Sequence, residues 1–330
     1  MGRSLFTLVI RRLLLALPVL WGVTFVTFIF IWLAPQSPAI VRGDTLDEDE
    51  IAQLEKSMGV DRPFFEQYFD WMGLDFLLSG SAYTEGGVLT GNLGTSLMRG
   101  QDVTTIVFQR ALVSVELAIW GTLWMIVLAT SLGLISAFHR NKLPDHFARV
   151  YAVLGISVPD FVVGIFLIML LGGTLFPAGG WVSWGDGVIP HLKHVVLPSF
   201  TVGFLITGLI TRLFRSDLLD TMNNEHVNLA KAMGLPRYQI IRHDIIKPAI
   251  IPTITSAGMA ISTLMGGLVL TEIVFTIPGL GRLAVNSVFS GDFPIIQGVV
   301  LLTATVFVLT NLLVDILYYY LDPRIRELEG

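Results

Sequence analysis

The sequence predicts an all-α membrane protein with six transmembrane helices and an external segment between the first and the second. Of its 330 residues, 53% are hydrophobic and only 14% are charged, whereas a soluble domain carries charge on about a quarter of its residues. The chain also contains six apolar runs, each close to or above the length of about 20 residues that a helix needs to cross a bilayer. The runs are Leu13–Ala34, Leu112–Phe138, Val150–Phe176, Val195–Leu213, Ile250–Ile277 and Ile295–Leu321.

Lysine and arginine residues are divided unequally between the segments that connect these runs. Basic residues are retained on the cytoplasmic side of a membrane, and alternate segments hold fourteen of them against six. Both termini and the segment between the fourth and fifth runs are therefore expected in the cytoplasm. The richer side carries Arg3, Arg11, Arg12, Arg140, Lys142, Arg149, Arg212, Arg215, Lys231, Arg237, Arg242, Lys247, Arg324 and Arg326, and the poorer side carries Arg42, Lys56, Arg62, Arg99, Lys193 and Arg282.

The net charge of −5 gives no reason to expect a nucleic-acid partner. Its acidic excess lies in the expected external region, Asp44–Asp102, and the cytoplasmic face is basic. The chain has no cysteine, which excludes disulfides, thiolate metal sites and a thiol nucleophile. It also lacks the G-x-x-x-x-G-K-[ST] loop that cradles ATP phosphates, so we expect no ATP site in the chain itself.

Four regions follow from this topology. Residues 1–34 form the cytoplasmic N-terminus and the first span, and residues 35–109 form the external segment. Residues 110–321 form a core of five helices that includes a cytoplasmic loop at 214–249, and residues 322–330 form a cytoplasmic tail. Within the external segment, Phe64–Met72 is rich in aromatic residues and amphipathic. We expect this stretch to lie on the membrane surface or against the span ends, with a platform for substrate as the alternative.

The third run is interrupted by Pro159, which Asp160 follows. Proline removes a backbone hydrogen bond from a membrane helix and usually kinks it, so a kink is expected there. An unpaired charge at the bilayer centre costs about 2.5–3.5 kcal/mol, and Asp160 is therefore expected to face the bundle interior or water. A structural pairing and a role in transport both remain open for this carboxylate.

A polar and basic segment, Ser216–Pro252, separates the fourth and fifth runs and predicts a docking element. Gly234 stands where a helix would end, because glycine adopts the left-handed cap conformation at little cost, and Pro236 can open the next helix. The pattern predicts two short amphipathic helices that meet at a bend in water beside the membrane. An interfacial helix without a partner is the alternative. The apolar residues expected on one face are Leu218, Leu219, Met222, Leu229, Ala230 and Met233.

The end of the fifth run cannot continue as a helix. It reads Pro278-Gly279-Leu280-Gly281, and irregular backbone at membrane depth is tolerated only where protein or water satisfies it. Glu272 is a carboxylate within an apolar run. It therefore either pairs with a basic group, for which Arg282 is the nearest candidate in sequence, or lines the transport path. We expect this region at the external mouth.

His191 and His194 have the spacing of two metal ligands one helical turn apart. They lie next to a proline and have no evident third ligand except Asp186. We therefore expect no metal site at these histidines.

Six motifs are spread over nearly the whole chain. They are Met58–Pro63, Gly91–Leu97, Glu225–Gly234, Gly266–Leu283, Gly291–Gly298 and Asn311–Arg326. Together they resemble the dipeptide, oligopeptide and nickel branch of the ABC importer permeases, and in particular its first (B-type) permease subunit. The chain departs from that branch by what looks like a small insertion around Ser81–Leu89 and by the carboxylate of Asp160.

The resemblance implies a type I ABC importer permease fold and a transport subunit without catalytic residues. It implies that the polar segment packs into a cleft of a cytoplasmic ATPase and transmits its movement to the membrane helices. The residues implied in this coupling are Glu225, Leu229, Ala230, Ala232, Met233, Gly234 and Leu235. The residues expected at the translocation path or external gate are Glu272, Phe275, Pro278, Gly279, Gly281, Asp292 and Pro294, together with Asp160 as a charge within a span.

The implied partners are a second homologous permease, two cytoplasmic ATPase subunits that bind ATP and Mg, and an extracellular or periplasmic solute-binding protein. The chain would then be a multi-pass protein of the inner or plasma membrane of a prokaryotic cell, and it would import di- or oligopeptides. Nickel or sugar import by the same architecture is one alternative, and an ion-coupled secondary transporter is another. An intramembrane hydrolase built on Asp160 and Asp315 lacks a surrounding protease motif.

Overall fold

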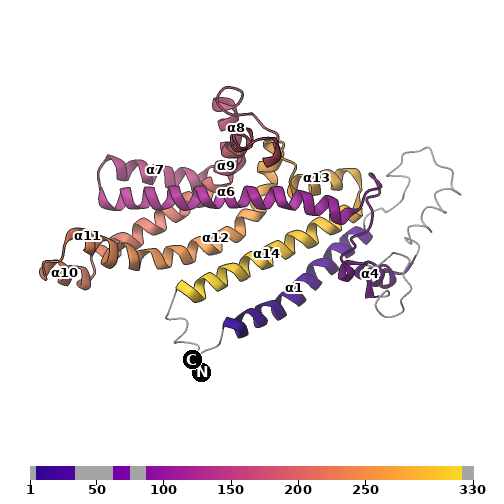
Figure 1. Cartoon of the computed structure of the whole chain (residues 1–330), viewed down its shortest axis with the longest axis horizontal. Coiled ribbons are helices and arrows are strands. Elements are labelled where there is room, and N and C mark those ends of the chain that lie inside the picture. The colour runs from indigo at the N-terminus through magenta and orange to yellow at the C-terminus, as the bar shows by residue number, and fades with distance from the viewer. Residues whose placement is uncertain (1–4, 34–61, 75–86, 322–330) are drawn as a thin grey trace. The chain divides into compact units, whose positions relative to one another are not determined.

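The computed structural model describes residues 5–33, 62–74 and 87–321, and the regular elements in these ranges are helices (Figure 1). Most of the expected external segment and the expected tail, 322–330, lie outside the described residues, as does the 81–86 part of the expected insertion. The chain divides into two compact units. Unit 1 is built mainly from Ser114–Pro278, and unit 2 from the described parts of 10–113 together with Gly279–Val308.

Four described helices are long and apolar enough to cross a membrane, and they correspond to the first, second, fourth and sixth predicted spans. Two shorter helices, bent by 114° at the break between them, would count as a fifth span if taken together. The predicted fifth span corresponds to a further long helix, α12 (Lys247–Val274), which is not among the four. An all-helical membrane fold is therefore confirmed, and the number six stays a prediction. The four helices are α1 (Leu5–Leu33), α6 (Val103–Phe138), α9 (Val188–Met222) and α14 (Phe293–Leu321).

The third predicted span is two helices, α7 (Leu143–Ser157) and α8 (Asp160–Leu171). The break lies at Val158 and Pro159, where a kink within one helix was expected. Proline has no N–H to donate to the preceding turn and its ring disfavours helical backbone at the residue before it. At 114° the bend is much larger than a kink, so the expectation of one continuous, kinked helix was wrong.

Unit 1 is centred on α9, which packs against α7, α8 and α12. Small residues allow close approach at two places along it. A Cβ on Gly208 would lie 2.9 Å from the backbone oxygen of Ala152 on α7, and one on Gly203 would lie 2.6 Å from the backbone oxygen of Gly121 on α6. Helices pack this closely in membranes where the side chain between them is reduced to hydrogen.

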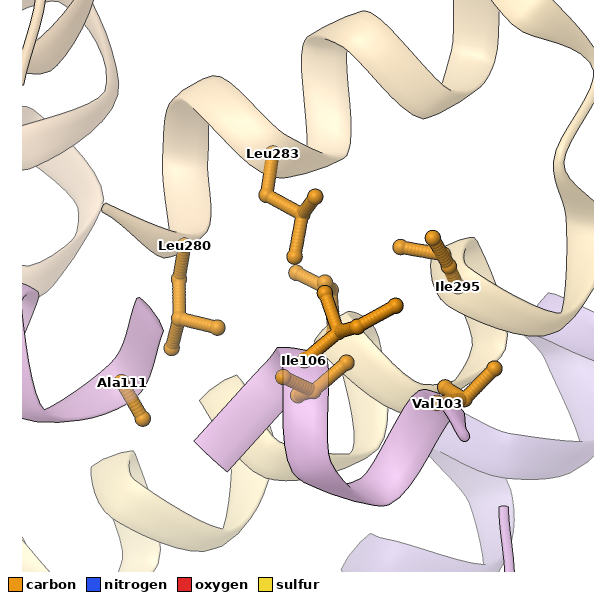
Figure 2. Packing of buried hydrophobic residues seen from close by; sticks show 8 residues of the cluster. Val103, Ile106, Ala111, Leu280, Leu283 and Ile295 are labelled. Atoms are coloured by element: carbon orange, nitrogen blue, oxygen red, sulfur yellow. The ribbon is translucent and has the colours of Figure 1, made fainter. Parts of the chain in front are cut away.

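Unit 2 contains α13 (Leu280–Ser290) and the first turns of α6 and α14. The buried residues of its core point toward one another from these three helices (Figure 2). Asp102 precedes α6 and binds the hydroxyl and the amide of Thr105, which together hold the pKa of its carboxyl below its usual range. The core residues are Val103, Ile106, Val107, Ala111, Leu280, Leu283, Ile295 and Val299.

The aromatic stretch forms α4 (Phe64–Met72), which packs against α1 in unit 2. Tyr68 is 2% exposed, its hydroxyl lies 3.1 Å from the Thr24 hydroxyl, and its ring meets Phe25 and Phe28 edge to face. Aromatic side chains gain from such offset and edge contacts beyond simple burial. The stretch therefore lies against the first predicted span, one of the two placements expected for it.

Candidate functional site

The expected docking segment begins later than its sequence suggested. Residues 216–222 belong to the last turns of α9, and a separate helix, α10 (Glu225–Ala232), follows after a two-residue break. Gly234 has a φ of +71°, as expected for the residue that ends this helix. Pro236 then opens α11 (Arg237–Gln239), which runs through a π-helical stretch, η3 (Ile240–Ile246), directly into α12. The prediction of two short helices was correct for α10 and wrong for the second, which continues into a long one.

One side of α10 is buried against the C-terminal end of α9, which is expected on the cytoplasmic side. Val227 is fully buried and Ala230 is 4% exposed, and both belong to a cluster with Phe214 and Leu218 of α9. The remaining buried members of this cluster are Ala137 of α6, Ile240 and Ile245 of η3, and Ala249 of α12. The imidazole of His226 also lies 3.0 Å from the backbone oxygen of Asp244, which holds α10 against η3. Displacement of α10 would therefore act directly on α9 and α12.

The other side of α10 is exposed. Leu229 and Met233 are 60% and 63% exposed, although the sequence placed them on the same face as Ala230. That expectation was wrong because the break after Met222 starts a new helix, so spacing counted from Leu218 no longer applies. Of the expected coupling residues, Ala230 is buried and Leu235 is half-buried, whereas Glu225, Leu229, Ala232, Met233 and Gly234 are exposed.

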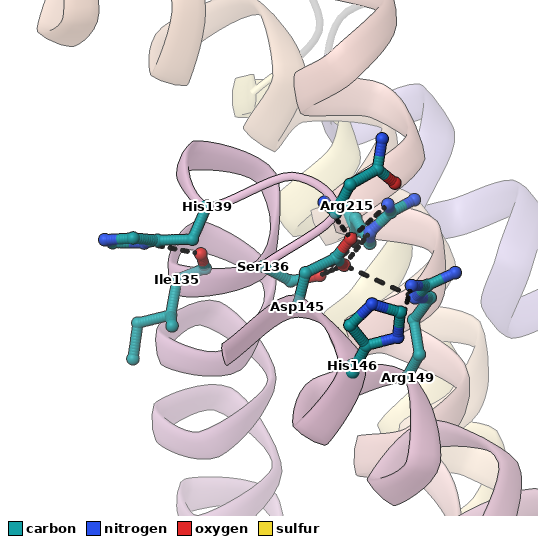
Figure 3. Close-up of polar contacts among 8 residues, drawn as sticks. Ile135, Ser136, His139, Asp145, His146, Arg149 and Arg215 are labelled. Carbon is teal, nitrogen blue, oxygen red and sulfur yellow. Dashed lines mark hydrogen bonds and ion pairs between the residues drawn. The ribbon is translucent and has the colours of Figure 1, made fainter. Parts of the chain in front are cut away.

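A buried ion pair lies beside this element, and sequence reasoning did not find it. The carboxylate of Asp145, fully buried at the start of α7, accepts hydrogen bonds from Nε and Nη2 of Arg215 on α9 at 2.8 and 3.1 Å (Figure 3). It also accepts from the Ser136 hydroxyl at 2.5 Å and from the Asn141 amide at 2.8 Å. Asp145 is the sole acidic residue between Phe138 and Val150. A lone acid in a basic connection between two apolar runs is the signal that could have indicated it.

The expected gate residues of unit 1 lie at the end of α12. Glu272 is fully buried and its Oε1 accepts a hydrogen bond of 2.6 Å from the Ser114 hydroxyl of α6. Phe275 is also fully buried, and a Cβ on Gly164 of α8 would lie 3.0 Å from its ring. The Phe275 carbonyl accepts from the Gly180 amide at 2.8 Å. These contacts bring α6, α8, α12 and the connection before α9 together around two of the expected residues.

Thr276 carries unusual backbone geometry next to this group. Its φ is +52°, in the left-handed region that non-glycine residues rarely occupy. The chain turns there out of α12, and Pro278 ends unit 1 two residues later. The helix-ending behaviour expected for this stretch is confirmed, since α12 stops at Val274 and α13 starts at Leu280.

The remaining gate residues belong to unit 2 or stand apart. Gly279 precedes α13 and Gly281 is buried within it. Asp292 is 1% exposed and accepts from the Ser96 hydroxyl at 2.5 Å, and Pro294 is the second residue of α14. Asp160 is half-buried at the first position of α8, where its carboxylate accepts the Phe161 amide at 2.8 Å. A carboxylate at a helix start is stabilised by the free N–H groups there.

The two histidines, His191 and His194, have different surroundings. His191 is fully buried, with Nδ1 2.6 Å from the Val182 carbonyl and Nε2 2.7 Å from the Glu116 carboxylate. Its ring stacks on Trp184 with centroids 4.0 Å apart. His194 lies near the Pro190 carbonyl instead. Both ring nitrogens of His191 thus bond within the protein, and the described residues contain no group of three potential ligands placed for a metal.

Comparison with known proteins decides the family. Residues 129–327 match the family described as the inner membrane component of binding-protein-dependent transport systems. Residues 5–118 match the N-terminal part described for the membrane component of the same systems. The chain belongs to this family. It is accordingly a multi-pass membrane permease subunit of an ABC importer and not an enzyme, and membership implies a transport complex with ATPase and binding-protein partners.

Relatives match over almost the whole length. A probable peptide ABC transporter permease, y4tP of Sinorhizobium fredii, is 31% identical over 96% of this chain and 98% of its own. The dipeptide transport system permease DppB of Alkalihalophilus pseudofirmus is 31% identical and the glutathione transport system permease GsiC of Salmonella typhimurium is 32% identical, with the same coverage. A crystal structure of an amino acid ABC transporter with histidines is similar with a TM-score of 0.52 and 13% identity, over 66% of this chain and 94% of that chain. This last likeness supports the permease fold.

Proposed function

We propose that the chain is the permease subunit of an ATP-driven importer of peptides and that it forms half of the translocation path beside a second homologous permease. The observation that carries the proposal is the match over 96% of the chain to permeases named for peptides, dipeptides and glutathione. These names share small peptides as a class of substrate. A solute-binding protein would deliver the peptide on the external side of the inner or plasma membrane.

The proposed coupling element is α10. Leu229 and Met233 expose large apolar side chains next to each other on the helix, and such groups mark a protein-interaction surface when they lie on an otherwise polar element. The opposite side of α10, through Val227 and Ala230, packs on α9. A push by an ATPase subunit on the exposed side would therefore move a membrane helix. Two such subunits would bind ATP and Mg, and both termini of this chain would lie on their side, in the cytoplasm.

The proposed external gate is the end of α12 with the turn into α13. Phe275 closes against Gly164 of α8, and Glu272 holds α12 to α6 through Ser114. Opening a path here requires α8 or α12 to move, because the Phe275 ring has no free space on the Gly164 side. Asp160 is proposed to contribute a carboxylate to this path, where it would favour the ammonium group of a peptide, and Asp292 is proposed to hold its own part of the gate through the Ser96 hydroxyl.

Uptake by the complete transporter tests the substrate. The permease pair, the ATPase subunits and the solute-binding protein are placed in vesicles, and uptake of a labelled dipeptide is followed with and without ATP. We expect uptake that requires both ATP and the binding protein. Nickel or sugar uptake in place of peptide uptake would overturn the substrate, and uptake without the ATPase subunits would overturn the transport class.

Co-purification tests the docking element. We expect Leu229→Asp to reduce the amount of ATPase subunit recovered with the permease about tenfold or more, since a hot-spot side chain is worth about 2 kcal/mol or more. Ile189→Asp is the matched control, because Ile189 is 69% exposed at the opposite end of α9. Equal recovery of the ATPase with both variants would show that the exposed side of α10 is not the docking surface.

A further inference from the structure

We propose that Asp145 is a positioning residue that fastens α7 to the end of α9 beside α10, so that α7 moves with the coupling element. The inference rests on the proposed function and assigns to α7 a part in it. In this arrangement α7 provides a second mechanical connection from α10 toward Phe275, in addition to the one through α9. The steps of that connection are the Asp145–Arg215 pair, a close helix contact, and the break at Pro159.

The first step of the connection is the Asp145–Arg215 pair, in which the carboxylate of Asp145 uses all of its acceptor positions. Asp145 Oδ1 accepts from the Ser136 hydroxyl and from Arg215 Nε, and Oδ2 accepts from the Asn141 amide and Arg215 Nη2. A carboxylate offers about four lone-pair positions, so no further donor is needed to keep it charged while fully buried. The two parallel N–H bonds to Arg215 also fix the orientation of the guanidinium plane. Figure 3 shows both bonds reaching from α9 to the start of α7.

A second arginine near the same carboxylate is a weaker contact and serves as an internal comparison. Arg149 Nε lies 3.6 Å from Asp145 Oδ1, and its side chain is 44% exposed, against 20% for Arg215. An ion pair that is this long and whose arginine is largely exposed contributes little. The attachment of α7 to α9 at this end therefore depends on Arg215.

Arg215 lies within the part of α9 that carries α10. Phe214, its neighbour in sequence, and Leu218, one turn later, are both buried in the cluster that holds Val227 and Ala230 of α10. A displacement of α10 that shifts these two residues must shift Arg215 with them, because one turn of helix is rigid. The carboxylate bound to its guanidinium then moves the start of α7.

The next steps lead from the start of α7 to the proposed gate. Near the C-terminal end of α7, Gly155 approaches Gly208 of α9 so closely that a Cβ on Gly155 would lie 3.0 Å from the Gly208 Cα. This contact and the ion pair attach α7 to α9 at two points. After Ser157 the chain breaks at Pro159 and enters α8, whose Gly164 lies against the Phe275 ring.

A purely structural ion pair would stabilise the fold without tying motion of α7 to that of α10. A distance between the two helices separates the alternatives. Because the chain has no cysteine, Val153→Cys on α7 and Lys231→Cys on α10 can be spin-labelled selectively, and both positions are exposed. The distance is measured by pulsed electron resonance in the assembled complex, with and without an ATP analogue, in a complex whose partner subunits carry no cysteine.

In the parent chain we expect a narrow distribution of the distance between the two spin labels, with the same mean in both nucleotide states. Asp145→Asn, which has the same shape but faces the Arg215 and Asn141 donors with an amide group, should broaden or shift the distance when the analogue binds. Arg215→Lys should have the same effect, since lysine keeps the charge but cannot form two parallel bonds. This second variant allows the inference to be tested even if Asp145→Asn fails to assemble. Arg149→Gln is the control and should behave as the parent. Unchanged distances in both Asp145→Asn and Arg215→Lys would overturn the inference.

Transport gives the functional readout. Peptide moved per ATP hydrolysed should fall at least fivefold in Arg215→Lys, within the range of about 5- to 150-fold that couplings between sites span, and it should stay at the parent value in Arg149→Gln. A parent complex that moves no peptide would overturn the proposed substrate, and the distance measurement would still decide the role of Asp145. An unchanged ratio in Arg215→Lys, with a parent complex that does move peptide, would count against the inference by itself.

Discussion

The close contact between α7 and α9 makes a quantitative prediction. An alanine at position 208 would bring its Cβ to 2.9 Å from the Ala152 carbonyl oxygen and 3.1 Å from the Gly155 Cα. Ordinary van der Waals contact begins at 3.4 Å, so the helices must separate by about 0.5 Å. Both obstructing atoms belong to the backbone and cannot rotate away. Overpacking of this kind costs about 1–3 kcal/mol, and we expect Gly208→Ala to lower the stability of the folded permease by that amount.

Thermal unfolding of the purified complex, followed by tryptophan fluorescence in one detergent, measures the loss. Gly155→Ala should cost a similar amount, because its Cβ meets the Gly208 Cα at 3.0 Å and the Phe204 carbonyl oxygen at 3.1 Å. The double variant should cost less than the two single losses added together, since both disturb one contact. Gly22→Ala in α1 is the control, because nothing lies within 4 Å of the added Cβ. If Gly208→Ala unfolds at the temperature of Gly22→Ala, α7 and α9 do not meet at this glycine pair.

Three further substitutions follow from single contacts. Gly234→Ala adds a Cβ that meets nothing within 4 Å, so its cost in thermal unfolding is that of the left-handed backbone alone, about 1–2 kcal/mol. Gly234→Asn should lose less, and an unchanged unfolding midpoint in the alanine variant would contradict the assigned φ. Ser114→Ala removes a donor to the buried Glu272 and should cost about 1–3 kcal/mol in thermal unfolding, whereas an unchanged midpoint would mean that the hydroxyl is not needed there. Asp292→Ala leaves the buried Ser96 hydroxyl without its acceptor at a similar cost of about 1–3 kcal/mol. Asp292→Asn keeps an acceptor oxygen and should lose less, so the reverse order would argue against this hydrogen bond.

Local sequence signals predicted well where several helices end. Gly234 ends α10 with a positive φ, Pro236 precedes the next helix, and the proline–glycine stretch after Phe275 separates α12 from α13. These outcomes depend on the backbone conformations open to one or two residues, which neighbouring helices alter little. At Pro159 the sequence predicted a kink and the structure has a break between two helices, because the sequence carried no information on the size of the bend.

Helix ends and buried faces were predicted less well around α10. Helical spacing placed Leu229 and Met233 with Leu218, but α9 stops at Met222 and α10 begins with its own rotation. The side of α10 that is buried is the side that meets Phe214 and Leu218, which depends on how the helices pack. Periodicity within a segment cannot record a break in phase between two helices.

The sequence by itself determined that this chain is a membrane protein, where its apolar runs lie, and which residues end its helices. Hydropathy and backbone preference are properties of short stretches, and they act before any helix meets another. Only the tertiary structure decided that Asp145 binds Arg215, which lies 70 residues later, that Glu272 bonds to Ser114 of α6, and that Leu229 is exposed. Each of these depends on which helices pack side by side, because Asp145 and Glu272 take these partners from neighbouring helices and the exposure of Leu229 is set by what α10 packs against.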